Sequence, residues 1–177
     1  MKTKIISITI LALFFVANIY GQETYQIFTT AGFKIKCGCK LYVNTTFIQM
    51  AKQQGMNNII AAYICAENEK NPDIGVINNI NIYDESKSYK NIQHSGYALF
   101  EKKYLEQYVT NLKSAGISYS YTTFQGVSAL EYAFNQHGIP TKAIIFLRNK
   151  KSYLIQVGTR KNLTSKYNLL KTSFVIL

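Results

Sequence analysis

Apolar and polar residues alternate along the chain between residues 33 and 43. One set of alternate positions is mostly apolar and comprises Phe33, Ile35, Cys37, Cys39, Leu41 and Val43. The other set comprises Lys34, Lys36, Gly38, Lys40 and Tyr42. A period of two places the two sets on opposite faces of a β-strand. The pattern predicts a half-buried strand over residues 33–43, with residues 25–29 as its hairpin partner.

Three other segments have the periodicity or the end signals of helices. Asn44 is suited to cap a helix over residues 45–54, and Gly55 suits the left-handed position that follows a helix. The longest helix is predicted over residues 94–115, where an aromatic stripe recurs at steps of three and four: Tyr97, Phe100, Tyr104, Tyr108 and Leu112. A third helix is predicted over residues 163–171.

The remaining apolar segments have the length and composition of strands. They cover residues 58–66, 76–83, 117–124, 127–135, 141–147 and 152–158, and a short apolar segment ends the chain. No repeat or low-complexity linker separates them. The order of elements predicts one α+β domain over residues 22–177, with an antiparallel sheet flanked by helices.

Residues 1–21 have the pattern of a secretory signal peptide. Lys2 and Lys4 precede an apolar run of about 13 residues, which is too short to span a bilayer as a helix. The small residue Gly21 is the expected cleavage point. We therefore expect a secreted or periplasmic protein whose mature chain has no transmembrane segment.

Composition adds a positive charge to this picture. Of the residues, 47% are hydrophobic and 16% are charged, which is typical of a globular protein. The 20 basic and 9 acidic residues give a formal net charge of +11, and loss of Lys2 and Lys4 with the leader would lower it to +9. Such a charge favours anionic partners.

Several segments together resemble the PsbP/DcrB-like group of secreted proteins. These are Phe33–Cys39, the Gly-centred stretch Thr123–Ala129, the strand Tyr153–Val157 and the ending Thr172–Phe174. The proline that usually follows the first of these strands is absent here. The resemblance spans about residues 33–174 and implies an α/β/α sandwich. It implies no particular activity, because a fold hosts many functions.

The cysteines are Cys37, Cys39 and Cys65, and they are the first candidates for chemistry. In an oxidising compartment, either Cys37 or Cys39 could bond to Cys65 if their strands are neighbours, which would leave one thiol. All three could instead be small core residues. A redox role is a further alternative, although the pair lacks the helix N-terminus that activates a thiol.

Other catalytic or metal-binding patterns are weak. His94 and His137 are far apart in sequence, and both are expected in caps or turns. No Cys-x₂-Cys pair indicates zinc, and no glycine-rich phosphate loop is present, so we predict no metal and no cofactor. The carboxylates Glu67, Glu69 and Asp73 are expected to lie in a solvated loop.

Basic residues form the most widespread signal. Two groups are candidates for anion binding: Lys34, Lys36 and Lys40, and then Arg148, Lys150 and Lys151. Secretion and the low arginine content argue against nucleic acid as the partner. Lysines on a sheet also protect strand edges from aggregation, so solubility is an alternative explanation.

The sequence therefore predicts a secreted, non-enzymatic binding or envelope accessory protein. Its partner would be an anionic envelope component or another protein. Two alternatives stay open. One is a thiol-dependent or hydrolytic enzyme that uses Cys37, Cys39 or Cys65 with His94 or His137. The other is a protein–protein module that pairs through an exposed strand edge.

Overall fold

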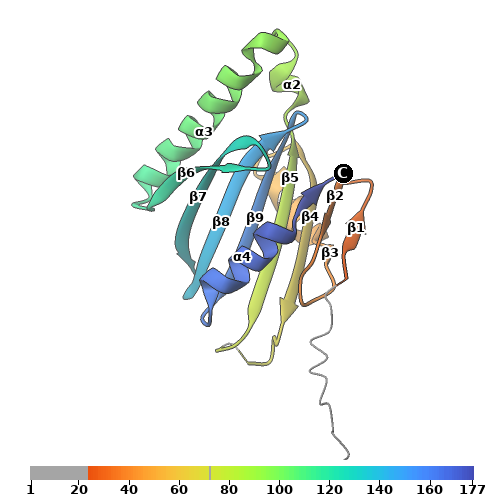
Figure 1. The fold of residues 1–177 in the computed structure, drawn as a ribbon, viewed down its shortest axis with the longest axis vertical. Coiled ribbons are helices and arrows are strands. Elements are labelled where there is room, and N and C mark those ends of the chain that lie inside the picture. The colour runs from red at the N-terminus through yellow and green to blue at the C-terminus, as the bar shows by residue number, and fades with distance from the viewer. Residues whose placement is uncertain (1–23, 72) are drawn as a thin grey trace, which may run out of the picture.

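An antiparallel seven-stranded sheet forms the centre of the structure, as Figure 1 shows. The computed structural model describes residues 24–71 and 73–177, so the predicted signal peptide lies outside the described residues. The strand order is β3 (Tyr42–Val43), β4 (Ile59–Glu67), β5 (Val76–Asp84), β9 (Lys151–Thr159), β8 (Ile139–Arg148), β7 (Val127–Gln136) and β6 (Tyr119–Phe124). A second, small sheet consists of β1 (Gln26–Phe28), β2 (Phe33–Ile35) and β10 (Val175–Ile176).

Helices cover both faces of the large sheet. The helices are α1 (Thr45–Gln53), α2 (Ser86–Tyr89), α3 (Tyr97–Ser114) and α4 (Leu163–Ser173), and a 3₁₀ turn (His94–Gly96) precedes α3. In Figure 1, α4 crosses the face that also carries the small sheet. Alternate residues of β8 show the two layers, because Ile144 and Phe146 pack on the α4 side and Ala143 and Ile145 pack on the α3 side. The predicted α+β class and sandwich are confirmed.

Aromatic stacking joins the two ends of the described chain to the sheet. The rings of Phe33 in β2 and Phe174 after α4 lie 5.1 Å apart, and those of Phe146 and Tyr153 lie 5.3 Å apart. Phe174 also contacts both of these sheet residues. All four side chains are buried. Each aromatic pair of this kind stabilises the fold by about 0.5–1.5 kcal/mol beyond the effect of its buried area. These pairs hold the small sheet against the large one.

The predicted strand over residues 33–43 is wrong as a single element. The chain forms β2, leaves regular structure after Ile35, and forms β3 in the other sheet. The alternation correctly identified most of the buried side, since Phe33, Ile35, Cys37 and Leu41 are buried. Val43, which it placed on the same side, is instead 51% exposed. The segment crosses from one sheet to the other while the same side chains continue to enter one core.

The predicted hairpin and caps are confirmed. Residues of β1 pair with β2 in antiparallel register, with Gln26 opposite Ile35. The side chain of Asn44 accepts a hydrogen bond of 3.0 Å from the backbone N–H of Phe47 at the start of α1. Gly55 after the helix has φ +87°, which only glycine adopts without strain.

The long helix is present and its predicted stripe packs against the core, but the most deeply buried residues lie partly beside the stripe. Leu105, Val109 and Leu112 are its buried residues, and Tyr104 and Tyr108 are only half-buried. A tyrosine needs a partner for its hydroxyl, and Tyr104 finds one in the buried carboxylate of Glu85 at 3.2 Å. The tyrosines therefore flank the apolar line, which Leu105 and Val109 form. Within the described ranges, no helix has the length and apolar character that crossing a membrane would require.

Candidate functional site

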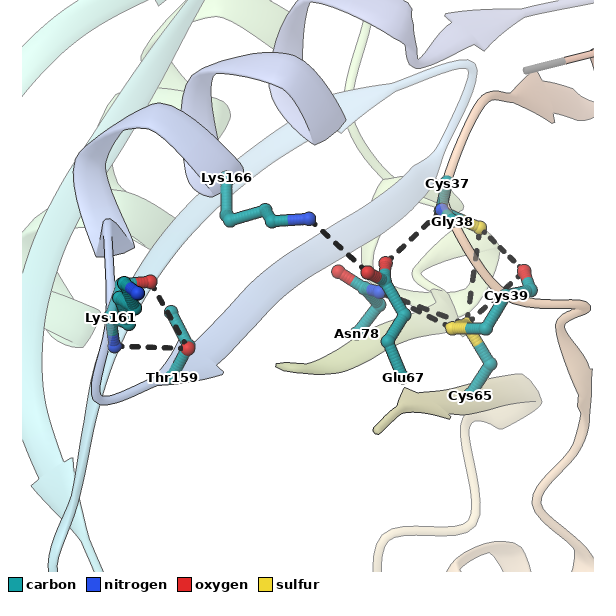
Figure 2. A network of polar contacts seen from close by, with 9 residues as sticks. All are labelled: Cys37, Gly38, Cys39, Cys65, Glu67, Asn78, Thr159, Lys161 and Lys166. Atoms are coloured by element: carbon teal, nitrogen blue, oxygen red, sulfur yellow. Dashed lines mark hydrogen bonds and ion pairs between the residues drawn. A yellow bond between two sulfur atoms is a disulfide. The ribbon is translucent and has the colours of Figure 1, made fainter. Parts of the chain in front are cut away.

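The three cysteines meet beneath the segment that joins the two sheets (Figure 2). Cys39 and Cys65 form a disulfide across a sequence separation of 26 residues, with their Cα atoms 5.8 Å apart. This is one of the two bonds that the sequence left open. The sulfur of Cys37 lies 3.9 Å from the sulfur of Cys65, so all three sulfur atoms form one cluster. Cys37 and Cys65 are buried, whereas Cys39 is half-buried.

Two amide side chains donate hydrogen bonds to sulfur atoms of the cluster. Gln26 donates from Nε2 to the sulfur of Cys37 at 3.2 Å, and Asn78 donates from Nδ2 to the sulfur of Cys39 at 3.5 Å. The Cys37 thiol itself donates to the carbonyl oxygen of Cys39 at 3.1 Å. No pattern in the sequence indicated these contacts of Gln26. The sequence did mark Asn78 as unusual, because it is a polar residue on the apolar face of β5.

Gln26 also holds the connecting segment in place. Its Nε2 donates to the carbonyl oxygen of Cys39 at 2.8 Å, and its Oε1 accepts from the N–H of Leu41 at 2.8 Å. These bonds satisfy backbone groups of a segment that has left the sheet, where no strand supplies partners. The side chain thus replaces a strand as the hydrogen-bonding partner, and fixes Cys37 and Cys39 relative to Cys65.

Glu67 lies against the Cys-Gly-Cys segment, and its predicted place in a solvated loop is wrong. It ends β4, where its carboxylate accepts from the N–H of Gly38 at 3.1 Å and from the Lys166 amine of α4 at 3.2 Å. A Cβ atom at Gly38 would lie 2.6 Å from this carboxyl group. Glycine between the two cysteines therefore allows the carboxylate to pack directly on the backbone.

Neither histidine belongs to the sulfur cluster. His94 precedes α3 and packs against the ring of Tyr97 at 4.8 Å. His137 lies in the β7–β8 turn and lines a pocket on the α3 side of the sheet, with Ile139 and Ile77. The cluster lies on the opposite, α4 side. The structure therefore does not bring the predicted thiol and histidine pair together, and the described residues include no group of His, Cys, Asp and Glu that could hold a metal ion.

The first group of candidate lysines lies on the outer face of the small sheet. The amines of Lys34 and Lys36 both lie 4.9 Å from the centre of the Tyr25 ring. The register places Ile27 and Val175 opposite Lys34, and the Ile27 side chain is 62% exposed. We call this surface the basic outer face; it comprises Tyr25, Ile27, Lys34, Lys36 and Val175. Lys40 is exposed in the connecting segment and lies outside both sheets.

The second group lies at the β8–β9 turn. The amine of Lys150 lies over the Tyr97 ring at 5.6 Å, next to α3. The amine of Lys151 instead reaches the β1–β2 turn, 3.9 Å from where Gly32 would carry a Cβ atom. Arg148 is exposed beside them. The amines of Lys150 and Lys151 thus point in different directions, and only that of Lys151 approaches the small sheet that carries the basic outer face.

Strand edges are also available in both sheets. β6 and β3 are the outer strands of the large sheet, and β1 and β10 are the outer strands of the small one. β6 contains no charged residue or proline, and its Tyr121 side chain is 55% exposed. Such a strand lacks the usual protection against pairing with another chain. The edge-pairing alternative therefore has a structural location.

Comparison with known proteins supports likeness only in the fold. The sequence matches no known protein family and no curated protein. A protein of unknown function from Pseudomonas aeruginosa has a TM-score of 0.41 and 10% identity over 82% of this chain and 88% of its own. The solution structure of cyanobacterial PsbP (CyanoP) from Synechocystis has a TM-score of 0.40 and 11% identity over 87% of this chain and 92% of its own. The second belongs to the group that the sequence resembles.

Proposed function

We propose that the protein is a secreted, non-enzymatic binding protein of the cell envelope, and that its basic outer face binds a phosphate-bearing envelope component. The observation that carries the proposal is the pair of lysine amines on one exposed tyrosine ring, beside an exposed isoleucine. Cations and apolar side chains on one face match the chemistry of an anionic amphiphile, which presents phosphate next to hydrocarbon.

The tyrosine ring organises the two charges. Lys34 lies in β2 and Lys36 directly follows this strand, and both amines lie 4.9 Å from the centre of the Tyr25 ring. A cation near an aromatic face gains about 0.5–1 kcal/mol at an exposed site. Tyr25 thus offsets part of the repulsion between the two amines and holds them together. A phosphate group can then contact both amines.

The apolar part of this face has a separate role. Ile27 lies next to Lys34 across the strand pair, and Leu177 at the end of the chain is 56% exposed near Gly32, to which its N–H donates. Large exposed side chains of this kind contribute about 25 cal/mol for each Å² that binding buries. The lysines would attract an anionic surface, and Ile27 would contact its apolar layer.

The test is sedimentation of the mature protein with lipid vesicles. Vesicles of phosphatidylcholine alone are compared with vesicles that also contain phosphatidylglycerol. Each lysine near an anionic surface contributes about 1 kcal/mol, so the double variant Lys34→Gln/Lys36→Gln should bind the anionic vesicles about 30-fold more weakly. The binding should also weaken as salt rises.

The matched control is Lys102→Gln/Lys103→Gln, which removes the same charge from the exposed side of α3. It should bind as the unchanged protein does, because these lysines lie outside the basic outer face. Equal losses in the two double variants would show that net charge alone drives binding. No preference of the unchanged protein for anionic vesicles would contradict the proposal itself.

A further inference from the structure

The sulfur cluster contains a disulfide and a thiol in contact. Cys37 lies 3.9 Å from the sulfur of Cys65, which is already bonded to Cys39. Cys65 is thus bonded to one cysteine of the Cys-Gly-Cys segment and in contact with the other. The two sulfur atoms would have to approach each other by about 1.9 Å to reach the disulfide bond length of about 2.05 Å. Both neighbours of Cys65 come from one short segment.

We propose that the three cysteines form a thiol–disulfide exchange site, in which the bond to Cys65 moves between Cys39 and Cys37. In the exchange, Cys37 loses its proton to solvent, and its thiolate attacks the sulfur of Cys65. The Cys37–Cys65 bond forms as the Cys39–Cys65 bond breaks. Cys39 leaves as a thiolate and takes a proton from solvent. One disulfide and one thiol exist before and after, so no oxidant or reductant is needed.

The amide side chains are placed to assist both directions of this reaction. A thiolate is stabilised by a hydrogen-bond donor, and each end of the reaction has one. Gln26 donates to the sulfur of Cys37, which is the attacking group, and Asn78 donates to the sulfur of Cys39, which is the leaving group. Asn78 is 3% exposed and also lies 3.7 Å from the sulfur of Cys65. A buried amide on the apolar face of β5 is thereby explained.

Exchange changes which thiol a partner can reach. Cys37 is buried, whereas Cys39 is half-buried next to the exposed Lys40. The first arrangement hides the thiol in the core, and the second places it nearer solvent. A thiolate near solvent can attack a disulfide of another molecule and form a mixed disulfide. The class of partner that this site would accept is therefore a protein or small molecule that contains a disulfide.

The experiment maps the alkylated cysteine in the native, unchanged protein. The oxidised protein is incubated with iodoacetamide at mildly alkaline pH, quenched, and digested with trypsin. Trypsin cleaves after Lys36 and after Lys40, so Cys37 and Cys39 stay in one short peptide. Fragmentation then tells which of them carries the label. We expect label on Cys39 that rises with time, in a peptide joined to the Cys65 peptide through Cys37.

Two outcomes would overturn the proposal. Label only on Cys37, or no label in the native state, would mean that the bond to Cys65 does not move. The matched control is Cys37→Ser, which retains the Cys39–Cys65 bond and removes the attacking group. It should take up no label, because it contains no thiol once its disulfide has formed. Label on Cys39 in this variant would show that labelling of Cys39 does not need attack by Cys37, and would contradict the proposal.

Two further variants test the geometry even if a cysteine change impairs folding. Asn78→Ala should lower the rate of Cys39 labelling about tenfold, because a hydrogen bond to a charged group is lost. Asn79→Ala, which changes the next residue on the other face of β5, should not lower it. In Cys39→Ser, oxidation should join Cys37 to Cys65 and leave no thiol, and two thiols after oxidation would contradict the proposal. None of these variants alters the basic outer face, so vesicle binding is tested separately.

Discussion

Replacing Cys65 by alanine removes the sulfur that both bonds of the cluster would use. The existing bond closes a loop with a sequence separation of 26 residues. In the chain-entropy description, a cross-link over such a loop lowers the entropy of the unfolded chain by an amount worth about 3.5 kcal/mol at 25 °C. Loss of one buried heavy atom adds about 1 kcal/mol, since Cys65 is only 1% exposed. We expect Cys65→Ala to lose about 4–5 kcal/mol of unfolding free energy.

The assay is urea denaturation followed by circular dichroism, with thermal unfolding as a second measure. For a chain of this length, the loss should lower the unfolding temperature by about 9–18 °C. Cys37→Ala is the control, because it keeps the disulfide and should lose only about 1 kcal/mol. Dithiothreitol should destabilise Cys37→Ala and leave Cys65→Ala unchanged. If both variants were equally stable without reductant, the reasoning that the disulfide restrains the unfolded chain would be refuted.

Three other substitutions test separate parts of the fold. Burial raises the pKa of Glu131, but hydrogen bonds from Lys171 and Tyr167 outweigh this effect, so the pKa lies below its usual value. The resulting stability is present above the pKa of the unfolded state and is lost as pH falls through the pKa of the folded state. Glu131→Gln should therefore flatten the acid side of a stability–pH curve measured by urea midpoints. Burial, with Tyr108 and Glu85 nearby, raises the pKa of Tyr83 to about 12. Because a tyrosine in the unfolded chain ionises near pH 10, the unchanged protein should lose stability between about pH 10 and 12. Tyr83→Phe should lose less stability over this range, and tyrosinate absorbance follows the ionisation. Asn44→Ala removes the cap of α1 and should cost about 1 kcal/mol in urea, whereas the exposed Asn57→Ala should cost little.

Part of the candidate site could be predicted from the sequence. The three cysteines, and the possibility that Cys65 bonds to Cys37 or Cys39, follow from alternation and from the expected oxidising compartment. The choice of Cys39 does not, because both cysteines occupy the same side of the segment. It depends on where that segment leaves β2, and Gln26 of the neighbouring strand holds it there through backbone groups of Cys39 and Leu41. Such bonds depend on contacts between strands that no local pattern encodes.

The position of Glu67 likewise depends on contacts between segments that are distant in the sequence. Its sequence neighbours Glu69, Lys70 and Asn71 are polar and exposed, which made a loop the natural prediction. The structure ends β4 at this residue and places its carboxylate between Gly38 and Lys166, which come from opposite ends of the chain. Only packing of α4 against the sheet brings Lys166 to this position.

The sequence by itself determined the local features of this protein. Side-chain period identified the buried residues of the first segments, Asn44 and Gly55 set the ends of α1, and the order of elements indicated an antiparallel sheet with helices. The tertiary structure decided how residues 33–43 divide between two sheets, which lysines share the Tyr25 ring, and which sulfur bonds to Cys65. The physical reason is that period and capping act between residues within a few positions of one another. Strand pairing and core packing join segments more than a hundred residues apart, as Lys36 and Ser173 do through hydrogen bonds at 2.9 and 3.1 Å.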